Sequence, residues 1–492
     1  MSEPTSTAAL LVLFGLLLAG GVLSTRASER SGVPAVLVFL GVGMLAGSDG
    51  LLGIAFEDYG YAFRVGTIAL VLILFDGGLN TPLARVRPYW KPAVSLATLG
   101  VLITGAVVGL GARALGLSWE LALLLGAIVS STDAAAIFST LRGSGITVQK
   151  RVASILELES GLNDPLAVLL TIVLTEAVSS GLGGVSWGWV ALDVVRELVV
   201  GGLVGWGMGR VGVLVLTRVR LRATGLYPAL TLALALTTYG VATLVGGSGF
   251  LAAYGAALLV GNAQLPYRAS LERVHDALAW LSQIGMFLLL GLLVYPARLG
   301  EVAGQGIALA LLLVFVARPL AVGVLLAPFG YPRTERVAIA WAGLKGAVPI
   351  ILATFPVLRG VPGAERLFDL AFFIVVVSVL LSGGTMPWLL KRLGLESDEP
   401  PPPPAVLEIV STQPLKGLLL SFHVEEELDI TGVPLSEIPF PETTAISLIL
   451  RDGAILVPKG NTVLQAGDHV YVATEPADLP FVQLLFGRPE AS

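Results

Sequence analysis

The stretch that decides the fold is Glu157-Leu158-Glu159-Ser160-Gly161-Leu162-Asn163-Asp164-Pro165, which lies in the apolar run 152–176. That run is long enough for a helix that crosses a bilayer, and yet the quoted stretch in its first half contains three carboxylates. An ionisable side chain at the bilayer centre costs about 2.5–3.5 kcal/mol on insertion scales, so such residues face a protein interior or a water-filled cavity. The stretch therefore predicts one helix within a bundle of membrane-spanning helices.

The whole chain has the composition of a polytopic membrane protein. Of its 492 residues, 55% are hydrophobic and 13% are charged, and the mean hydropathy is +0.85. Soluble domains contain about 25% charged residues. We therefore predict an all-α membrane domain with thirteen transmembrane helices, at 7–24, 34–53, 62–79, 92–112, 119–141, 152–176, 187–217, 226–245, 249–263, 277–295, 303–328, 336–357 and 367–390.

Composition and motifs also exclude several classes of function. The absence of Cys rules out disulfides and thiolate chemistry, and a net charge of −5 argues against a nucleic-acid partner. His275, His423 and His469 stand in no metal-ligand spacing, so we expect no transition metal and no other cofactor. The first run lacks the flanks of a cleaved leader and is expected to remain as a helix.

The basic residues predict the orientation. Connections that follow odd-numbered runs contain 17 Lys and Arg, whereas those that follow even-numbered runs contain 6. Because cytoplasmic loops are enriched in Lys and Arg, we expect the N-terminus outside and the C-terminus in the cytoplasm of an inner-membrane protein.

A second domain follows residue 395. We predict a transmembrane domain over 1–395, an acidic and polyproline linker over 396–404, and a small α+β cytoplasmic domain over 405–488. In that domain we expect strands at 406–410, 418–424, 445–450, 454–457 and 469–473, a hairpin turn at Asp452-Gly453 and a helix at 478–486. It lacks a catalytic constellation, so we expect a regulatory or assembly role.

Ionisable residues in the middle of the predicted helices are the functional candidates: Asp76, Asp133, Glu157, Glu159, Asp164, Arg318 and Lys345. On a helix, Glu157, Ser160 and Asp164 share one face, and Glu159 and Asn163 form a neighbouring stripe. Pro165 supplies no backbone donor, so a carbonyl one turn earlier is left free. This combination of oxygens suits a weakly held cation and suits a proton equally well.

Two of the predicted helices contain interruptions. The fifth contains Ser130-Ser131-Thr132-Asp133, where hydroxyl side chains compete for backbone hydrogen bonds, and the twelfth contains Gly343, Gly346 and Pro349. Each is fifth in a block of six helices, counting 1–6 and 8–13. Paired interruptions in matching positions of two inverted halves indicate the midplane site of a transporter.

A purely structural interpretation is that the buried carboxylates pair with Arg318 and Lys345. Five mid-helix carboxylates face only these two cations, so pairing cannot account for all of them. We expect Glu159 to belong to such a pair and Asp164 to be functional. Asp76 remains open between the two roles, and Arg318 is expected to be structural.

Thr132-Asp133 and the 159–165 run resemble the NhaP-like, electroneutral branch of the monovalent cation/proton antiporters, over most of residues 1–395. The 343–349 segment is similar to that family's penultimate-helix motif, although Lys345 stands where many members have Arg. The chain from residue 406 resembles the C-terminal subdomain of RCK regulators, and the combination resembles bacterial potassium/proton antiporters.

The resemblance implies a homodimer in which a core domain moves as an elevator. It implies that Asp164 binds cation and proton alternately, that Asp133 and Thr132 lie where two broken helices cross, and that Ser160 is a ligand. Asp76 matches an acidic position on the third helix, and Asn163 is the family's mark of one-for-one exchange. Glu159 is implied to pair with Lys345 or Arg318. The resemblance of the C-terminal domain to RCK regulators implies that this domain could bind a regulatory ligand.

These observations favour a secondary transporter that exchanges potassium for protons, and not an enzyme. Sodium/proton exchange is the alternative, because no residue above distinguishes sodium from potassium. A remote alternative is an RCK-regulated potassium channel, since Thr237–Val241 faintly resembles a selectivity filter.

Overall fold

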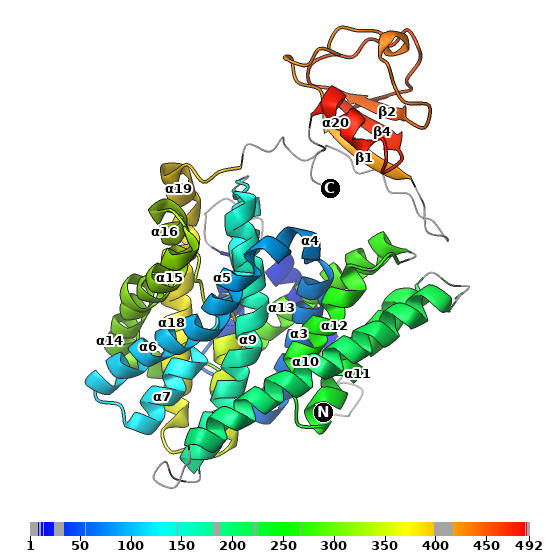
Figure 1. The fold of residues 1–492 in the computed structure, drawn as a ribbon. Coiled ribbons are helices and arrows are strands. Elements are labelled where there is room, and N and C mark those ends of the chain that lie inside the picture. The colour runs from blue at the N-terminus through cyan, green and yellow to red at the C-terminus, as the bar shows by residue number, and fades with distance from the viewer. Residues whose placement is uncertain are drawn as a thin grey trace. The chain divides into compact units, whose positions relative to one another are not determined.

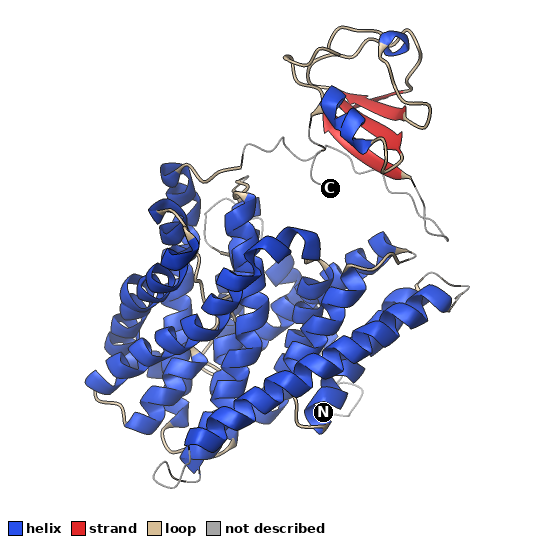
Figure 2. Cartoon of the chain, viewed as in Figure 1, coloured by secondary structure: helices blue, strands red, loops and turns tan. Residues whose placement is uncertain are grey.

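The computed structural model describes residues 14–23, 34–54, 56–144, 146–179, 187–219, 225–265, 267–397 and 417–487, with a few single residues between them. The chain divides into two compact units, Met1–Ala263 with Ser270–Ser397, and Gln264–Ala269 with Asp398–Ser492. The first is a helical bundle and the second contains a small sheet, and each is described by itself (Figures 1 and 2).

Eight helical stretches of the first unit are long and apolar enough to cross a membrane. They are α3 (Tyr59–Leu79), Leu83–Ala114 (α4 to α6), α9 (Lys150–Ser179), Gly188–Arg218 within α10 (Trp187–Arg218), α11 (Leu226–Leu244), α13 (Arg268–Leu292), Pro296–Phe329 (α14 and α15) and Ala364–Leu393 (α18 and α19). Shorter apolar helices are Phe14–Leu23, α2 (Ala35–Ala46), α7 (Trp119–Ile128), α12 (Gly249–Gly261) and α17 (Val348–Leu358).

All of these helices overlap the thirteen predicted runs, and the all-α membrane fold is confirmed. Two boundaries were wrong by nine residues. The fourth run was predicted to begin at 92, whereas the helical stretch begins at Leu83. The tenth run was predicted to begin at 277, whereas α13 begins at Arg268. Its first two turns are rich in charged residues, and hydropathy does not detect a helix that continues beyond the apolar stretch.

Both predicted interruptions are present. In the fifth run, α7 ends at Ile128 and α8 (Ala134–Gly143) begins after a break of five residues. In the twelfth run, α16 (Arg333–Trp341) is followed by a break of six residues, after which α17 begins at Val348. Pro349 occupies the first turn of α17, where its missing N–H costs nothing. The residues between the half-helices, 129–133 and 342–347, are referred to below as the crossing.

Small residues allow close helix packing on the long helix α10. A Cβ at Gly201, Gly205 or Gly209 would approach atoms of Ser248, Ala252 and Ala256 respectively to about 3 Å or less. These residues recur every fourth position on both helices, and such spacing lets two membrane helices approach along their backbones.

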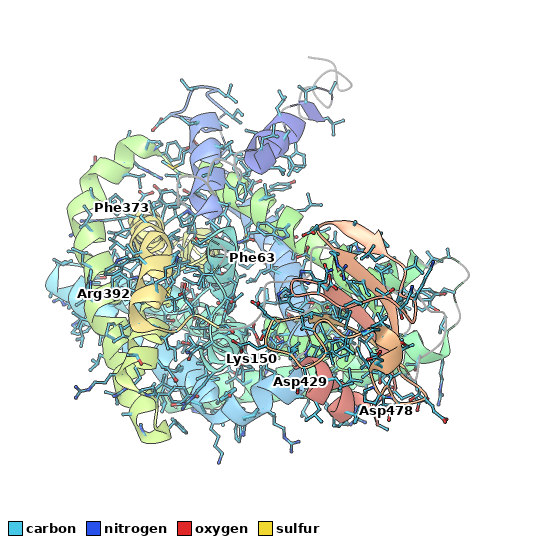
Figure 3. The ribbon with its side chains drawn as sticks, turned by 90° about the horizontal axis from the view of Figure 1, so that it is seen from above. Phe63, Lys150, Phe373, Arg392, Asp429 and Asp478 are labelled. Carbon is cyan, nitrogen blue, oxygen red and sulfur yellow. The ribbon has the colours of Figure 1, made fainter. Side chains whose placement is uncertain are left out.

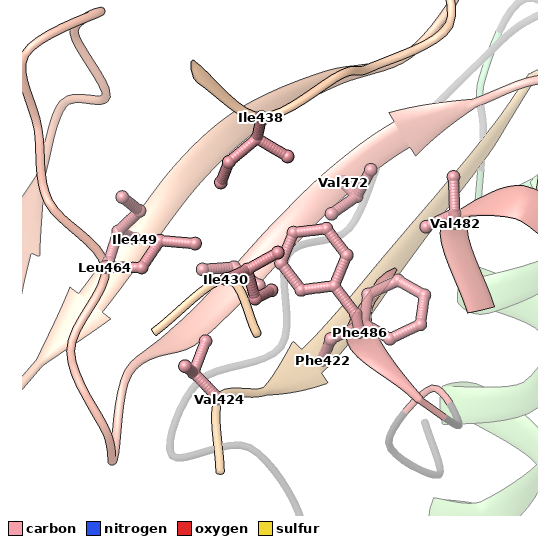
Figure 4. Close-up of a cluster of buried hydrophobic side chains, with 10 residues drawn as sticks. Phe422, Val424, Ile430, Ile438, Ile449, Leu464, Val472, Val482 and Phe486 are labelled. Carbon is pink, nitrogen blue, oxygen red and sulfur yellow. The ribbon is translucent and has the colours of Figure 1, made fainter. Parts of the chain in front are cut away.

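The second unit is built on a four-stranded antiparallel sheet in the order β1-β4-β2-β3. Its elements are β1 (Leu418–His423), β2 (Ala445–Arg451), β3 (Ala454–Leu456), β4 (His469–Thr474) and α20 (Leu479–Phe486). Asp452 and Gly453 both have positive φ, as the predicted hairpin turn requires. Phe422, Val472 and Phe486 belong to the apolar core (Figure 4). The predicted strand 406–410 and most of the linker lie outside the described residues.

The start of the linker pairs with the loop between α8 and α9. Gln149 N–H donates to Leu395 O at 3.1 Å and Ser397 N–H donates to Thr147 O at 2.9 Å, on either side of the antiparallel bridge Val148–Glu396. The chain that leads to the second unit is therefore attached to the loop that introduces α9. Lys150 and Arg392 lie at this end of the bundle, and Figure 3 views the molecule from it.

We predict that Val148→Cys with Glu396→Cys forms a disulfide under mild oxidation. The two flanking hydrogen bonds make 148 and 396 a non-hydrogen-bonded pair, whose Cα atoms lie about 4.5 Å apart, within the range that a disulfide spans. Because the chain has no native Cys, thiol labelling with a maleimide-polyethylene glycol reports on these two positions alone. The control is Gln149→Cys with Glu396→Cys, whose side chains point to opposite faces. Equal labelling of both pairs would contradict the bridge.

Candidate functional site

The two breaks hold each other directly. Asp133 N–H donates to Leu344 O at 2.9 Å. The Lys345 ammonium, which is fully buried, donates to Ser130 O at 3.1 Å and to Ser131 O at 2.7 Å. A cation therefore lies against the free carbonyls that follow α7, where the helix dipole is negative. Lys345 satisfies backbone groups that lipid and apolar side chains leave unpaired.

The opposite charge caps the other half-helix. Asp133 Oδ1 accepts from Ala136 N–H at 3.0 Å, in the first turn of α8, where the dipole is positive. A Cβ at residue 346 would collide with this carboxylate, so only Gly346 allows the second break to lie against it. Asp133 and Lys345 thus stabilise opposite ends of the break in the fifth helix.

Two polar side chains of α9 attach that helix to the same break. Asn163 Nδ2 donates to Thr132 Oγ1 at 2.6 Å, and Asn163 Oδ1 accepts from Thr132 N–H at 3.4 Å. Ser160 Oγ donates to Thr132 O at 2.9 Å and accepts from Ala134 N–H at 3.2 Å. The structure therefore brings Thr132, Asp133, Ser160 and Asn163 together.

Asp164 lies at the same place but is bound differently. Its side chain is 6% exposed, and Asp133, Lys345 and the Ser131 side chain are its polar neighbours. Its Oδ1 has no hydrogen-bond partner among the described residues. The other buried carboxylate oxygen without a hydrogen bond in the described chain, Glu335 Oε2, lies 3.4 Å from Arg151 Nε. Asp164 thus keeps a buried carboxylate oxygen that neither a hydrogen bond nor an ion pair of the described residues satisfies.

The structure pairs Glu159 with Arg318, and not with Lys345. The guanidinium donates from both terminal nitrogens to both carboxylate oxygens, and Nη2 lies 2.7 Å from Oε2. Both side chains are less than 5% exposed. A π-helical turn, Leu313–Ala317, immediately precedes Arg318, and Gly343 leaves room for the guanidinium. This bidentate geometry is available to Arg but not to Lys.

Asp76 and Glu157 have polar neighbours of their own. Asp76 accepts from Asn80 Nδ2 at 2.9 Å and neighbours Asp276 and Glu272 of α13. Glu157 neighbours Arg85. Within the described part of the chain, no hydrogen bond or ion pair joins Asp76 to the crossing. The shared helix face that the spacing predicted for Glu157 and Asp164 therefore does not give them common partners.

Ser131 is the polar residue of this region that pattern alone missed. It is 1% exposed and neighbours Asp164. The available signal was its place in the Ser130-Ser131-Thr132 run, but three consecutive hydroxyls cannot be ranked without knowing which way each side chain points.

Comparison with known proteins shows which family the chain belongs to. Residues 10–392 match the family described as "Sodium/hydrogen exchanger, transmembrane", and residues 419–487 match the TrkA-C domain. The chain belongs to the sodium/hydrogen exchanger family. It is therefore a multi-pass membrane cation/proton antiporter with a C-terminal TrkA-C domain, a transporter and not an enzyme, and the predicted resemblance is confirmed.

The similarity to two named relatives covers nearly the whole of this exchanger chain. The K(+)/H(+) antiporter NhaP of Alkalimonas amylolytica is 42% identical over 98% of this chain and 84% of its own. The K(+)/H(+) antiporter NhaP2 of Shewanella sp. (strain ANA-3) is 40% identical over 97% of this chain and 83% of its own. The solved sodium proton antiporter MjNhaP1 of Methanocaldococcus jannaschii superposes with a TM-score of 0.65 at 25% identity, over 78% of this chain and all of that one.

We predict that Glu159→Gln lowers the free energy of unfolding by about 3–5 kcal/mol, because it leaves the Arg318 guanidinium buried without a counter-charge. Replacing both residues, as Glu159→Gln with Arg318→Met, should restore much of the loss. The measurement is detergent-based unfolding followed by Trp fluorescence. Glu176→Gln, which breaks an ion pair with Arg359 that is more than half exposed, is the matched control and should cost about 1 kcal/mol or less. A loss for Glu159→Gln no larger than the control's would refute the structural role.

Proposed function

We propose that this exchanger is an electroneutral potassium/proton antiporter that exchanges one cation for one proton by alternating access at Asp164. The observation that carries the proposal is the buried Asp164 oxygen without a partner, at the crossing of two broken helices. The assignment of potassium is supported by relatives about 40% identical over almost the full length, which are named K(+)/H(+) antiporters.

The physical argument for exchange is competition for one carboxylate. A buried ionised carboxylate without a partner is costly, so Asp164 is stabilised by either a proton or a cation. Glu159 is neutralised by Arg318, and Asp133 caps α8. If the empty, ionised site is too costly to carry across the apolar barrier, only loaded forms cross, and competition becomes obligatory exchange.

The remaining candidates receive supporting roles in this proposal. Thr132 and Ser160 are proposed as cation ligands, and they bind each other at the break. Asn163 holds the same break without adding a second titrating group, which suits one-for-one exchange. Asp76, which has no hydrogen bond or ion pair to the crossing among the described residues, binds the cation on its way to or from Asp164. Lys345 and Arg318 are structural, and no transition metal or cofactor is involved.

Sodium/proton exchange is the second candidate, because MjNhaP1 is named a sodium proton antiporter. The structure does not support the potassium-channel alternative, because the segment that resembled a selectivity filter is helical. Thr237–Val241 lies inside the continuous helix α11, where Thr238 Oγ1 donates to Leu234 O at 2.6 Å. A selectivity filter instead presents a row of free carbonyls to the ion.

We further propose the assembly and placement of the protein. The protein lies in an inner membrane with its N-terminus outside and its C-terminus in the cytoplasm, in accordance with the distribution of Lys and Arg. It is a homodimer whose core domain moves as an elevator. The transmembrane domain spans 1–395, the linker 396–404 and the regulatory domain 405–488. The linker and the TrkA-C domain convey a regulatory signal, whose ligand is not assigned.

Asp164→Asn should abolish exchange, because the neutral amide side chain neither takes up a proton nor supplies the negative charge that attracts a cation. The measurement is cation-induced recovery from an imposed proton gradient in proteoliposomes, with potassium, sodium and lithium compared. Recovery should favour potassium and should not change when valinomycin and potassium clamp the voltage.

The exposed Glu176→Gln on the same helix is the control and should behave as the wild type. Recovery with sodium alone would move the substrate to the second candidate. Cation flux that survives in Asp164→Asn without proton movement would overturn the antiport mechanism at this residue.

Truncation after Ser397 tests regulation. We expect the truncated chain to retain Asp164-dependent exchange but to lose part of the pH dependence of the full-length protein, since the TrkA-C domain is removed. Exchange rates are compared across external pH in matched proteoliposomes. A pH profile that is superimposable on that of the full chain would contradict a regulatory role.

A further inference from the structure

We propose that the Ser131 hydroxyl is a ligand of the transported cation beside the Asp164 carboxylate, and that it favours potassium over sodium. This inference rests on the proposed function and names a further specificity-determining residue for it. It is carried by the geometry of the break between α7 and α8.

Of the three consecutive hydroxyl residues before Asp133, only one has a hydroxyl without a partner. Ser130 Oγ donates to Ala127 O at 2.6 Å, and Thr132 Oγ1 accepts from Asn163 Nδ2 at 2.6 Å. Ser131 Oγ has no hydrogen-bond partner among the described residues, although its side chain is 1% exposed. The fold therefore employs two of the hydroxyls structurally and leaves the third unused.

The backbone around Ser131 is fixed on both sides. Lys345 Nζ binds the Ser131 carbonyl at 2.7 Å and the Ser130 carbonyl at 3.1 Å. The next residue, Thr132, is held through its N–H by Asn163 and through its carbonyl by Ser160. The Ser131 hydroxyl is thus presented by a rigid backbone, as a ligand must be if it is to discriminate between ions.

The two buried oxygens without partners are neighbours. The Ser131 side chain lies close enough to the Asp164 carboxylate to interact with it as a donor, but neither Ser131 Oγ nor Asp164 Oδ1 has a hydrogen bond of normal distance and angle to another described residue. Each buried unpaired polar atom carries a desolvation cost of about 1–3 kcal/mol, so a functional partner for both is expected. A cation bound between a carboxylate and a hydroxyl would satisfy both oxygens at once.

A buried hydroxyl without a partner elsewhere on α9 offers a comparison. Ser154 is fully buried and its Oγ is also unpaired, but it lies ten residues before Asp164 on α9, which is about 15 Å along the helix. What distinguishes Ser131 is the carboxylate beside it. Ser154 consequently supplies a matched control for the loss of a buried hydroxyl.

The choice of ion follows from field strength. A carboxylate alone is a strong-field ligand and favours the smaller sodium ion, whereas added neutral oxygens weaken the average field and favour a larger, less strongly hydrated ion. Number and field strength of neutral oxygens are among the accepted origins of potassium selectivity. Removing the Ser131 hydroxyl should therefore harm potassium binding more than sodium binding.

The experiment compares Ser131→Ala, Ser131→Thr and Ser154→Ala in full-length protein, with Asp164→Asn in parallel. Proteoliposome exchange gives the half-saturating concentration and the maximal rate for potassium and for sodium. We expect Ser131→Ala to raise the half-saturating potassium concentration about tenfold, the equivalent of one lost polar contact, and the sodium value by less. Ser131→Thr, which keeps a hydroxyl, and Ser154→Ala should stay near the wild type.

If a variant shows no measurable transport, ion binding is measured instead as the rise in melting temperature of the purified protein on adding potassium or sodium chloride. Loss of potassium stabilisation in Ser131→Ala with retention in Ser131→Thr supports the ligand role. Unchanged half-saturation for both ions in Ser131→Ala, or equal losses in Ser131→Ala and Ser154→Ala, overturns it. Retained exchange in Asp164→Asn instead refutes the proposed function itself, so the two failures are distinguishable.

Discussion

The transmembrane unit depends on one constraint, which is that two broken helices must satisfy each other's free backbone groups away from water. Lys345 supplies donors to the carbonyls that follow α7, Asp133 supplies an acceptor at the start of α8, and the Asp133 N–H reaches the carbonyl of Leu344. Irregular backbone at membrane depth is tolerated only where protein groups complete it in this way. The site exists because this requirement is met by charged side chains.

The same requirement separates structural from functional charges. Arg318 neutralises Glu159 with bidentate geometry, while Lys345 and Asp133 are bound by backbone at the break. Asp164 is the member of this group that keeps an oxygen without a partner. Among these charged residues, Asp164 is thus the one that we propose binds the substrate, and the others stabilise the fold. Such a division allows a site to change occupancy while the backbone that supports it stays the same.

Much of the fold was predictable because its signals are local. Apolar length indicated the membrane helices, hydroxyl and glycine residues indicated both breaks, and Asp452-Gly453 indicated the hairpin turn. The predicted beginning of α13 failed because its first turns are helical but polar. For the site, helix spacing placed Ser160 and Asp164 on one face and Asn163 on the neighbouring stripe, but it did not show that Glu157 has other partners.

The sequence by itself determined the class of protein, the interrupted helices and the candidacy of Asp164, since hydropathy and short-range backbone preferences act over a few residues. Only the tertiary structure decided that Glu159 binds Arg318, 159 residues away, and that Lys345 binds carbonyls 214 and 215 residues away. It also decided that Ser131, and not Ser130 or Thr132, presents a free hydroxyl to Asp164. Partner choice among buried polar groups depends on distance and direction between helices, which no local pattern specifies.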